Sequence, residues 1–470
     1  MNPQSDMIAR RRLLLGLLFS LAPGVTPALQ AADAGLSPDR RQSSLLQRLR
    51  VPDPADPWQI DAFFNDYRVR LSLPHDLNQL TQLAPAIEKM VRRRIEFRRR
   101  NIDVLRRVAL EFDAVLKNSP PTHWAQHEQT LEQVAMALPA RPISAPASAL
   151  SLHEPLLAAL PAYTKVDFFL PQELMDPVSR RLRELGLKSR VRLHGRPEIE
   201  SSEDQISLRR HTTYWMRDVA MASANRQGRS PLLLPLAFYQ INDLSRPDND
   251  YVHQLASAEQ PVRRVPLFFK GGNLHVGFTG QRHILFIGQN ELEFNQEFFY
   301  TAFFYYPPPD AVLELFQQLT GANEVRVLPN SKNLYHLDLV MAVIEPGTVA
   351  LLEPLDKEAL LPEDRHVLDH VRQAVTAAGF RIVGIPTLSD WVKEFKSPVN
   401  ILPFRHRDSG IASVIVPQFE DRIIILKGKP YSIHEKIKQA YAQAGLKPIF
   451  ATSNLYQLGG NFHCAVLPLR

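Results

Sequence analysis

The sequence of 470 residues contains a single cysteine, Cys464, six positions before its last residue. One cysteine excludes an intramolecular disulfide and a metal site built from a cysteine cluster. Glycine-rich phosphate loops are also missing, because no Walker-type or GxGxxG pattern follows an expected strand. These absences remove disulfide scaffolds, cysteine-ligated metal centres and the common nucleotide-binding loops from the candidate classes. A lone thiol has to be explained in another way.

Long apolar runs are scarce as well, and the one of note lies at the start of the chain. Three arginines, Arg10 to Arg12, precede the apolar run Leu13–Ala22, and small residues follow around positions 28–34. This order is typical of a secretory signal peptide. The alternative is an uncleaved membrane anchor, but the run is short for a bilayer and Pro23 interrupts it. We therefore expect a signal peptide over residues 1–31 and a periplasmic or secreted protein.

The formal net charge of +6 is unevenly distributed. Residues 1–31 carry a net +2 and residues 84–118 a net +5, which leaves the rest of the chain close to neutral. A nucleic-acid-binding protein needs a basic face on its functional domain, so we expect no nucleic-acid partner. The apolar residues of 84–118 recur at helical spacing, with arginines mostly off that stripe. This basic helix either presents a solvated face, which we favour, or makes a weak contact with a membrane surface or a partner.

The composition, 45% hydrophobic and 22% charged, is that of an ordinary folded protein. We expect a helical N-terminal region over 35–138, including a second helix at 123–138, and a linker rich in Pro, Ala and Ser within 139–159. From 160 to 470 the pattern alternates between strands and helices, which predicts an α/β domain. Strands are expected at 165–170, 190–193, 282–287, 349–352, 381–385, 412–416 and 422–426, and helices at 172–185, 365–378 and 433–444.

Four short segments of the α/β region carry residues suited to chemistry. They are Tyr-Trp-Met-Arg-Asp at 214–218, Phe-Lys-Gly-Gly-Asn-Leu at 269–274, Tyr-His-Leu-Asp-Leu at 335–339 and Leu-Gly-Gly-Asn-Phe-His-Cys at 458–464. Each alone has a plain structural interpretation: a surface ion pair, a turn, a strand with two polar residues on one face, or a buried cysteine acting as a small hydrophobe. None of them is decisive by itself.

Taken together and in this order, the segments resemble the guanidino-group-modifying, or pentein, superfamily. The similarity is greatest to peptidyl-arginine deiminases and agmatine deiminases, and it covers roughly residues 160–470. In that family an Asp follows Trp-x-Arg/Gln, a Gly-Gly-Asn-type strand and a His-x-Asp come next, and a Cys lies near the C-terminus. The resemblance implies a five-bladed, pseudo-fivefold α/β propeller, here preceded by the helical N-terminal region.

The resemblance also implies roles for individual residues, and these roles make chemical sense. Asp218 and Asp338 would hold the planar guanidinium by charge-assisted hydrogen bonds. Cys464 would attack its carbon as the nucleophile, giving a covalent thiouronium intermediate. His336 would protonate the departing amine and then activate water. Trp215 and Asn273 are further candidates for substrate contact. The scheme requires no metal ion and no organic cofactor.

Agmatine and arginine deiminases carry an acidic residue just before the Gly-Gly pair, where this chain has Lys270. That departure favours the peptidyl-arginine branch, and it is equally compatible with altered or lost chemistry. The primary hypothesis is a deiminase that hydrolyses the guanidinium of an arginine-containing peptide or of a small guanidine such as agmatine. The alternatives are an amidinotransferase, in which an amine intercepts the intermediate, and a non-catalytic binding module of the same fold.

Overall fold

The chain divides into two units, residues 1–44 and 45–470, and every residue described by the computed structural model belongs to the second. The described residues are 107–110, 112–114, 130–138, 150–196, 214–222, 231–235, 250–256, 261–280, 282–303, 307–426 and 428–469. The expected signal peptide, with its cleavage site, and most of the basic helix 84–118 lie outside them. Of that helix, 107–110 and 112–114 are helical, and Ala109 and Phe112 of its apolar stripe are buried.

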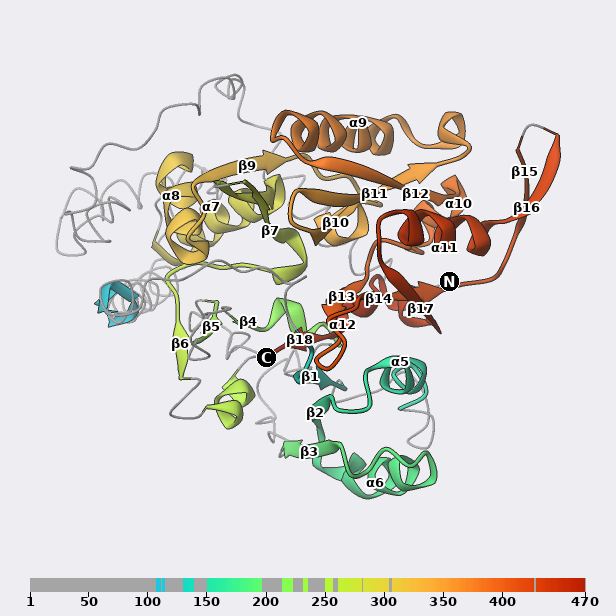
Figure 1. Cartoon of the computed structure of the whole chain (residues 1–470). Helices are drawn as coiled ribbons and strands as arrows, with labels where there is room; N and C mark the ends of the chain where they lie inside the picture. Colours follow the sequence, from blue (N-terminus) through green and yellow to red (C-terminus); the bar gives the residue numbers. More distant parts are fainter. Residues whose placement is uncertain are drawn as a thin grey trace, which may run out of the picture. The chain divides into compact units, whose positions relative to one another are not determined.

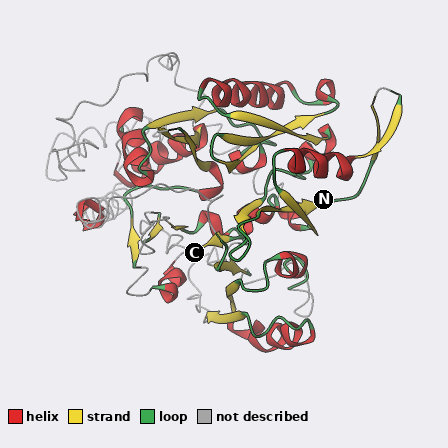
Figure 2. Ribbon diagram, viewed as in Figure 1, coloured by secondary structure: helices red, strands yellow, loops and turns green. Residues whose placement is uncertain are grey.

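One pattern of strands recurs along the described chain (Figures 1 and 2). In each of four three-stranded sheets the first strand pairs antiparallel with the second, and the second pairs parallel with the third. These sheets are β4 (Met221–Ala222), β5 (Leu232–Leu234) and β6 (Val262–Arg264); β7 (Leu274–Thr279), β8 (Arg282–Gly288) and β9 (Glu324–Leu328); β10 (Met341–Glu345), β11 (Thr348–Pro354) and β12 (Arg381–Thr387); and β13 (Leu402–Arg405), β14 (Ala412–Gln418) and β17 (Lys447–Thr452).

A four-stranded sheet shows the same pattern but joins the two ends of the described chain. The C-terminal strand β18 (Leu467–Pro468) pairs antiparallel with β1 (Gln133–Ala137), and β1 pairs parallel with β2 (Lys165–Pro171). The fourth strand is β3 (Val191–Arg196). The prediction of a helix at 123–138 is therefore wrong for residues 133–137, which form a buried strand.

Helices cover these sheets, and their ends follow ordinary sequence signals. Both α8 (Pro309–Thr320) and α9 (Pro362–Ala377) begin with a proline, whose missing N–H costs nothing in the first turn. The side chain of Ser432 caps α11 (Ile433–Gln443) by accepting the backbone N–H of Glu435. Further helices of the described residues are α5 (Glu154–Ala159), which lies within the expected linker, α6 (Met175–Glu184), α7 (Gln289–Phe303), α10 (Ser389–Lys393) and α12 (Phe462–Ala465).

The expected strands and helices of the α/β region are confirmed, with ends that differ by a few residues at most. For example, the expected helix at 365–378 is α9, and the expected strand at 422–426 is β15 (Ile423–Leu426). Together with β16 (Lys429–Ser432), β15 forms a hairpin that projects from the sheets in Figure 1. The fold is therefore mixed α/β, as predicted.

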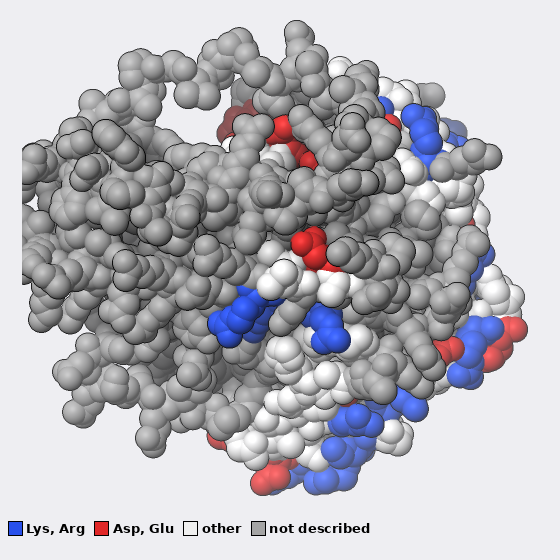
Figure 3. Space-filling view, turned by 90° about the vertical axis from the view of Figure 1, so that its left-hand side faces the viewer, with Lys and Arg blue, Asp and Glu red and all other residues white. Residues whose placement is uncertain are grey.

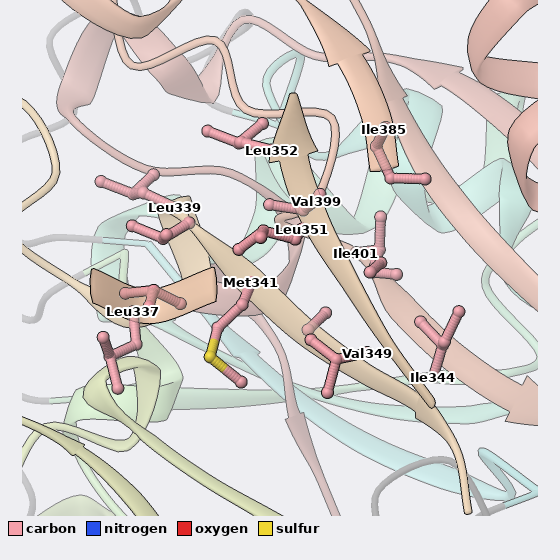
Figure 4. Close-up of a cluster of buried hydrophobic side chains, with 14 of the residues drawn as sticks. Leu337, Leu339, Met341, Ile344, Val349, Leu351, Leu352, Ile385, Val399 and Ile401 are labelled. Atoms are coloured by element: carbon pink, nitrogen blue, oxygen red, sulfur yellow. The ribbon is translucent and has the colours of Figure 1, made fainter. Parts of the chain in front are cut away.

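The largest apolar core lies around β10, β11 and β12, and it holds two segments of the candidate site in place (Figure 4). Leu337 and Leu339 enter this core from either side of Asp338, and Val399 and Ile401 enter it from either side of Asn400. All four apolar side chains are almost completely buried. Each such residue contributes roughly 1.5–3 kcal/mol on burial, so the two polar residues between them are firmly held.

Positive charge is not gathered in one region on the described part of the face that Figure 3 shows. On the face drawn in Figure 3, the described lysines and arginines form separate groups with acidic residues among them. No helix among the described residues is long and apolar enough to span a bilayer. Nor do the described residues contain a group of three or more His, Cys, Asp or Glu side chains arranged to hold a metal ion.

One buried histidine predicts a pH-dependent stability. His153 is wholly buried against Phe168 and Tyr214, and burial lowers its pKa to about 4. Between pH 6.5 and 4 the unfolded chain binds a proton at this residue and the folded chain does not. Stability is therefore complete above pH 6.5 and falls by about 3 kcal/mol as the pH drops to 4. Urea unfolding at pH 7.5 and 5 should show a smaller loss in His153→Leu than in wild type. Equal losses would contradict this.

Candidate active site

Residues of the candidate site occupy the same place in each repeat, just before the first strand of a sheet. Asp218 precedes β4, Asn273 precedes β7, Asp338 precedes β10, Asn400 precedes β13 and Cys464 precedes β18. Equivalent positions of the repeats meet, so that residues 126 positions apart, Asp338 and Cys464, are in contact. The repeated strand order explains why four separate sequence segments form one cluster.

Asp338 lies at the centre of this cluster. Its side chain is wholly buried in a 3-10 turn, Leu337–Leu339, where the sequence predicted a strand. Its Oδ2 atom accepts a hydrogen bond from the Cys464 thiol at 3.0 Å and contacts His463 Nδ1 at 2.9 Å. Its Oδ1 atom has no hydrogen-bond partner among the described residues. Burial raises the pKa of Asp338 to about 7, although the hydrogen bond from the thiol opposes that rise. The carboxylate thus retains an unused acceptor.

Asn400 fixes the cysteine relative to Asp338. Its side-chain amide donates to Cys464 Sγ at 3.2 Å and to the backbone carbonyl of Asp338, also at 3.2 Å. Its Oδ1 atom accepts the backbone N–H of His463 at 2.9 Å. With both ends of its amide in use and no exposed surface, Asn400 joins α12 to the turn that carries Asp338.

His336 and Asp338 both face Gly272. A Cβ atom placed on Gly272 would lie 2.6 Å from Asp338 Oδ2 and 3.3 Å from His336 Nδ1, so only glycine fits there. The Nε2 atom of His336 is buried and has no partner among the described residues. Burial, reinforced by the charge of Lys270, holds the pKa of His336 well below its usual value. His336 is therefore neutral near pH 7 and able to accept a proton.

Asp218 supplies the second carboxylate. It is partly exposed, it lies in the 3-10 turn Met216–Asp218, and it accepts a hydrogen bond from the backbone of Gly272. Burial raises the pKa of Asp218 to about 6, while the positive charge of Lys270 opposes the rise. The charge on Asp218 also raises the pKa of Asp338, so the two carboxylates are electrostatically coupled. A cation placed between them would relieve that repulsion.

Trp215 and Asn273 support the site in different ways. The Trp215 ring packs against the loop of Cys464, since a Cβ atom on Gly460 would lie 2.8 Å from it. Asn273 is wholly buried; its Oδ1 atom accepts the backbone N–H of Leu337 at 2.9 Å, and its amide donates to Glu291 Oε1 at 3.2 Å. This geometry is that of a residue that holds the His336–Asp338 segment; the substrate contact expected from the sequence stays a prediction.

The positive charge of Lys270 acts on several groups of the site. Its ammonium lies 5.2 Å from the centre of the Phe294 ring, and its backbone N–H donates to Glu291 Oε2 at 3.1 Å. Burial raises the pKa of Glu291 to about 7, and the charge of Lys270 opposes this rise, as it opposes the rise in the pKa of Asp218. The same charge lowers the pKa of His336. Lys270 is therefore part of the electrostatics of the cluster.

Sequence reasoning missed Asn400 and Glu291. Asn400 belongs to Pro-Val-Asn, a segment without obvious catalytic residue types, and Glu291 looks like one acidic residue among several on a helix. The position of Asn400 in the sequence could have revealed it, because Asn400 lies just before an apolar strand. Asp218, Asp338 and Cys464 also lie just before a strand.

No protein-family model matches the chain, and no curated protein matches it in sequence. Solved structures do match. The agmatine deiminase of C. jejuni has a TM-score of 0.52 at 15% identity, with 73% of this chain and 94% of that chain covered. A putative agmatine deiminase has a TM-score of 0.52 at 16% identity, with 74% of this chain and 97% of that chain covered. A putative peptidyl-arginine deiminase has a TM-score of 0.52 at 15% identity, with 74% of this chain and 98% of that chain covered. The chain therefore shares the fold of these solved structures.

Proposed function

We propose that this chain is a cysteine-dependent hydrolase that converts a guanidinium group to a ureido group and ammonia. The observation that carries the proposal is the buried contact of the Cys464 thiol with Asp338, 3.0 Å, beside the neutral His336. The names of the similar structures, agmatine deiminase and putative peptidyl-arginine deiminase, describe the same type of reaction and support the proposal.

In the proposed reaction the guanidinium lies between Asp218 and Asp338, where the free Oδ1 of Asp338 can accept one of its N–H groups. The thiol proton passes to His336, and the Cys464 thiolate forms a bond with the guanidinium carbon. His336 returns that proton to the leaving nitrogen, which departs as ammonia. The neutral His336 then removes a proton from a water molecule that attacks the thiouronium carbon. Collapse breaks the C–S bond and releases the ureido product; His336 returns its proton to the Cys464 thiolate, and the second proton of the water passes to solvent.

The proposal extends to the organisation of the chain. We infer that the five sheets with the shared strand order are the five blades of the propeller, and that the catalytic domain begins early enough to include β1. The helical N-terminal region, the signal peptide over residues 1–31 and a periplasmic or secreted location are part of the same proposal. N-terminal sequencing of protein from the periplasmic fraction tests the export; an intact Met1 on cytoplasmic protein would refute it.

A substrate screen tests the reaction. Purified full-length protein is incubated with a blocked arginine peptide, agmatine or free arginine, and ureido product and ammonia are measured. We expect equal amounts of the two products from at least one substrate. Transfer of the amidino group to an added labelled amine would identify an amidinotransferase instead. Absence of turnover with all three would favour a binding module.

The positive charge of Lys270 leads to a prediction of which substrate is preferred. A second cation about 6 Å from its ammonium would cost roughly 2–3 kcal/mol at an effective dielectric constant near 20. Agmatine carries such a second cation, and a blocked arginine peptide does not. We therefore expect a higher kcat/KM for the peptide in wild type, and a shift of at least about 30- to 150-fold towards agmatine in Lys270→Glu, the factor for loss of the repulsion alone.

The matched control is Lys357→Glu, which reverses the charge of an exposed lysine that pairs with Asp369 outside the site. It should leave the order of substrates unchanged. A wild-type enzyme that prefers agmatine would contradict the proposed selectivity, and an unchanged order in Lys270→Glu would show that this lysine does not determine it.

A further inference from the structure

Arg217 is a buried cation to which the reaction scheme assigns no role. It lies in the turn that carries Asp218, and only 1% of it is exposed. Its Nε atom donates to the backbone carbonyl of His463 at 3.2 Å, whereas Nη1 has no hydrogen-bond partner among the described residues. A charged side chain is rarely buried in this way unless negative charge lies close by.

The negative charge that compensates Arg217 belongs to the reacting groups. Burial lowers the pKa of Arg217 to about 9, and the nearby Asp338 and Cys464 raise it in part. Arg217 therefore stays charged at neutral pH. In the structure the Cys464 thiol still donates its proton to Asp338. Once that proton leaves, two negative groups adjoin one buried guanidinium.

No histidine of the cluster can serve as this positive charge in the free protein. Burial holds the pKa of His336 and of His463 well below the usual value, and it lowers that of His275, which stacks on His463, to about 3. Burial and the charge of Asp338 in turn raise the pKa of the Cys464 thiol well above its ordinary value. A stabilising charge for the thiolate in the free protein therefore has to come from a cation that stays charged when buried, and Arg217 is such a cation.

The site contains two permanent cations with separate fields. Lys270 acts on Asp218, Glu291 and His336. Arg217 interacts with Asp338 and Cys464, and its charge lowers the pKa of His463 and His275. Among the described residues, the titratable and charged groups that surround the thiol are Arg217, Asp218, His275, Tyr335, His336, Asp338 and His463.

We propose that Arg217 is the fixed positive charge that stabilises Cys464 as a thiolate, and that its bond to the His463 carbonyl holds this charge beside α12. Arg217 is thus a positioning residue for the reaction, one that acts through the cysteine rather than through the substrate. The inference rests on the proposed function, but it concerns the ionisation of a thiol, which can be measured without any substrate.

The test uses the fact that Cys464 is the only cysteine in the chain, so that every alkylation event reports on it. The rate of alkylation by iodoacetamide is measured against pH for full-length wild type, Arg217→Gln and Arg217→Lys. The glutamine amide can still donate to the His463 carbonyl but carries no charge, whereas lysine keeps the charge. We expect the pH midpoint to rise by about one unit or more in Arg217→Gln, and by clearly less in Arg217→Lys.

The control is Lys357→Gln, which removes an exposed cation outside the site and should leave the alkylation midpoint close to that of wild type. A wild-type midpoint in Arg217→Gln would overturn the proposal, as would an equal rise in Arg217→Lys. Thermal melts show whether each variant is folded. If Arg217→Gln does not fold, Arg217→Met takes its place as the uncharged variant: a rise of about one unit supports a role for the charge, and a wild-type midpoint overturns it.

These outcomes are separate from the fate of the proposed function. If Cys464 were not the nucleophile, turnover would survive in Cys464→Ala, yet the alkylation midpoints of the arginine variants would still report whether Arg217 controls the thiol. If Cys464 is the nucleophile and Arg217 plays no electrostatic part, Cys464→Ala is inactive and the midpoints do not move.

Discussion

Cys464→Ala is expected to lose turnover of any guanidine substrate by at least about three orders of magnitude, as loss of a nucleophile generally causes. The thiol is almost completely buried, and its polar contacts are to Asp338 and Asn400. Removing it deletes the atom that forms the covalent bond and little of the packing. Initial rates of ureido formation, together with a thermal melt, measure the two effects separately.

The matched control is Ser413→Ala, which shortens another small, buried side chain, in β14 and outside the cluster. This variant should turn over substrate at nearly the wild-type rate. Substantial activity in Cys464→Ala would remove the cysteine mechanism, whereas equal losses in both variants would indicate a general effect on folding.

Asp338→Asn is expected to reduce kcat/KM by roughly 10²- to 10⁴-fold, the range that follows from breaking a buried charge pair at 3–5 kcal/mol. The asparagine keeps the shape of the side chain but cannot carry the charge that holds a guanidinium. It also places an amide where Oδ2 now accepts the Cys464 thiol and contacts His463. Steady-state kinetics with the preferred substrate measure the loss.

Asp167→Asn is the control for this prediction. Asp167 is also a buried aspartate, but it bonds Gln133 and His194 within the four-stranded sheet. Its replacement should lower thermal stability while kcat/KM stays within a few-fold of wild type. If Asp338→Asn behaved like Asp167→Asn, Asp338 would be a structural residue and its assignment to the guanidinium would be wrong.

The α/β region could be predicted from the sequence because its strands and helices are set by local patterns. Apolar runs such as 349–352 and the helical periodicity of 365–378 appear at the expected places, as β11 and α9. Residues 133–137 could not be predicted in this way. They form a strand because they pair with β2 and with β18, which lies at the other end of the chain. Non-local pairing of this kind leaves no local signal.

The candidate site was only partly predictable for a related reason. Cys464, His336 and Asp338 have distinctive residue types and a family-like order, and the structure brings them together. The bonds that use both ends of the Asn400 amide depend on which repeats meet at the centre, and that is a property of the fold. The same holds for Lys270: its charge acts on Asp218 in the folded structure, and the sequence alone does not give the direction of its side chain.

The most direct test of the central claim is the mass of Cys464 during turnover. Wild-type protein is mixed with its preferred guanidine substrate, quenched in acid within one turnover, digested and analysed by mass spectrometry. The mechanism predicts an adduct equal to the substrate minus ammonia on the peptide that contains Cys464, and its disappearance as ureido product accumulates. Ureido product formed at the full rate while Cys464 stays unmodified at every time point would contradict the account.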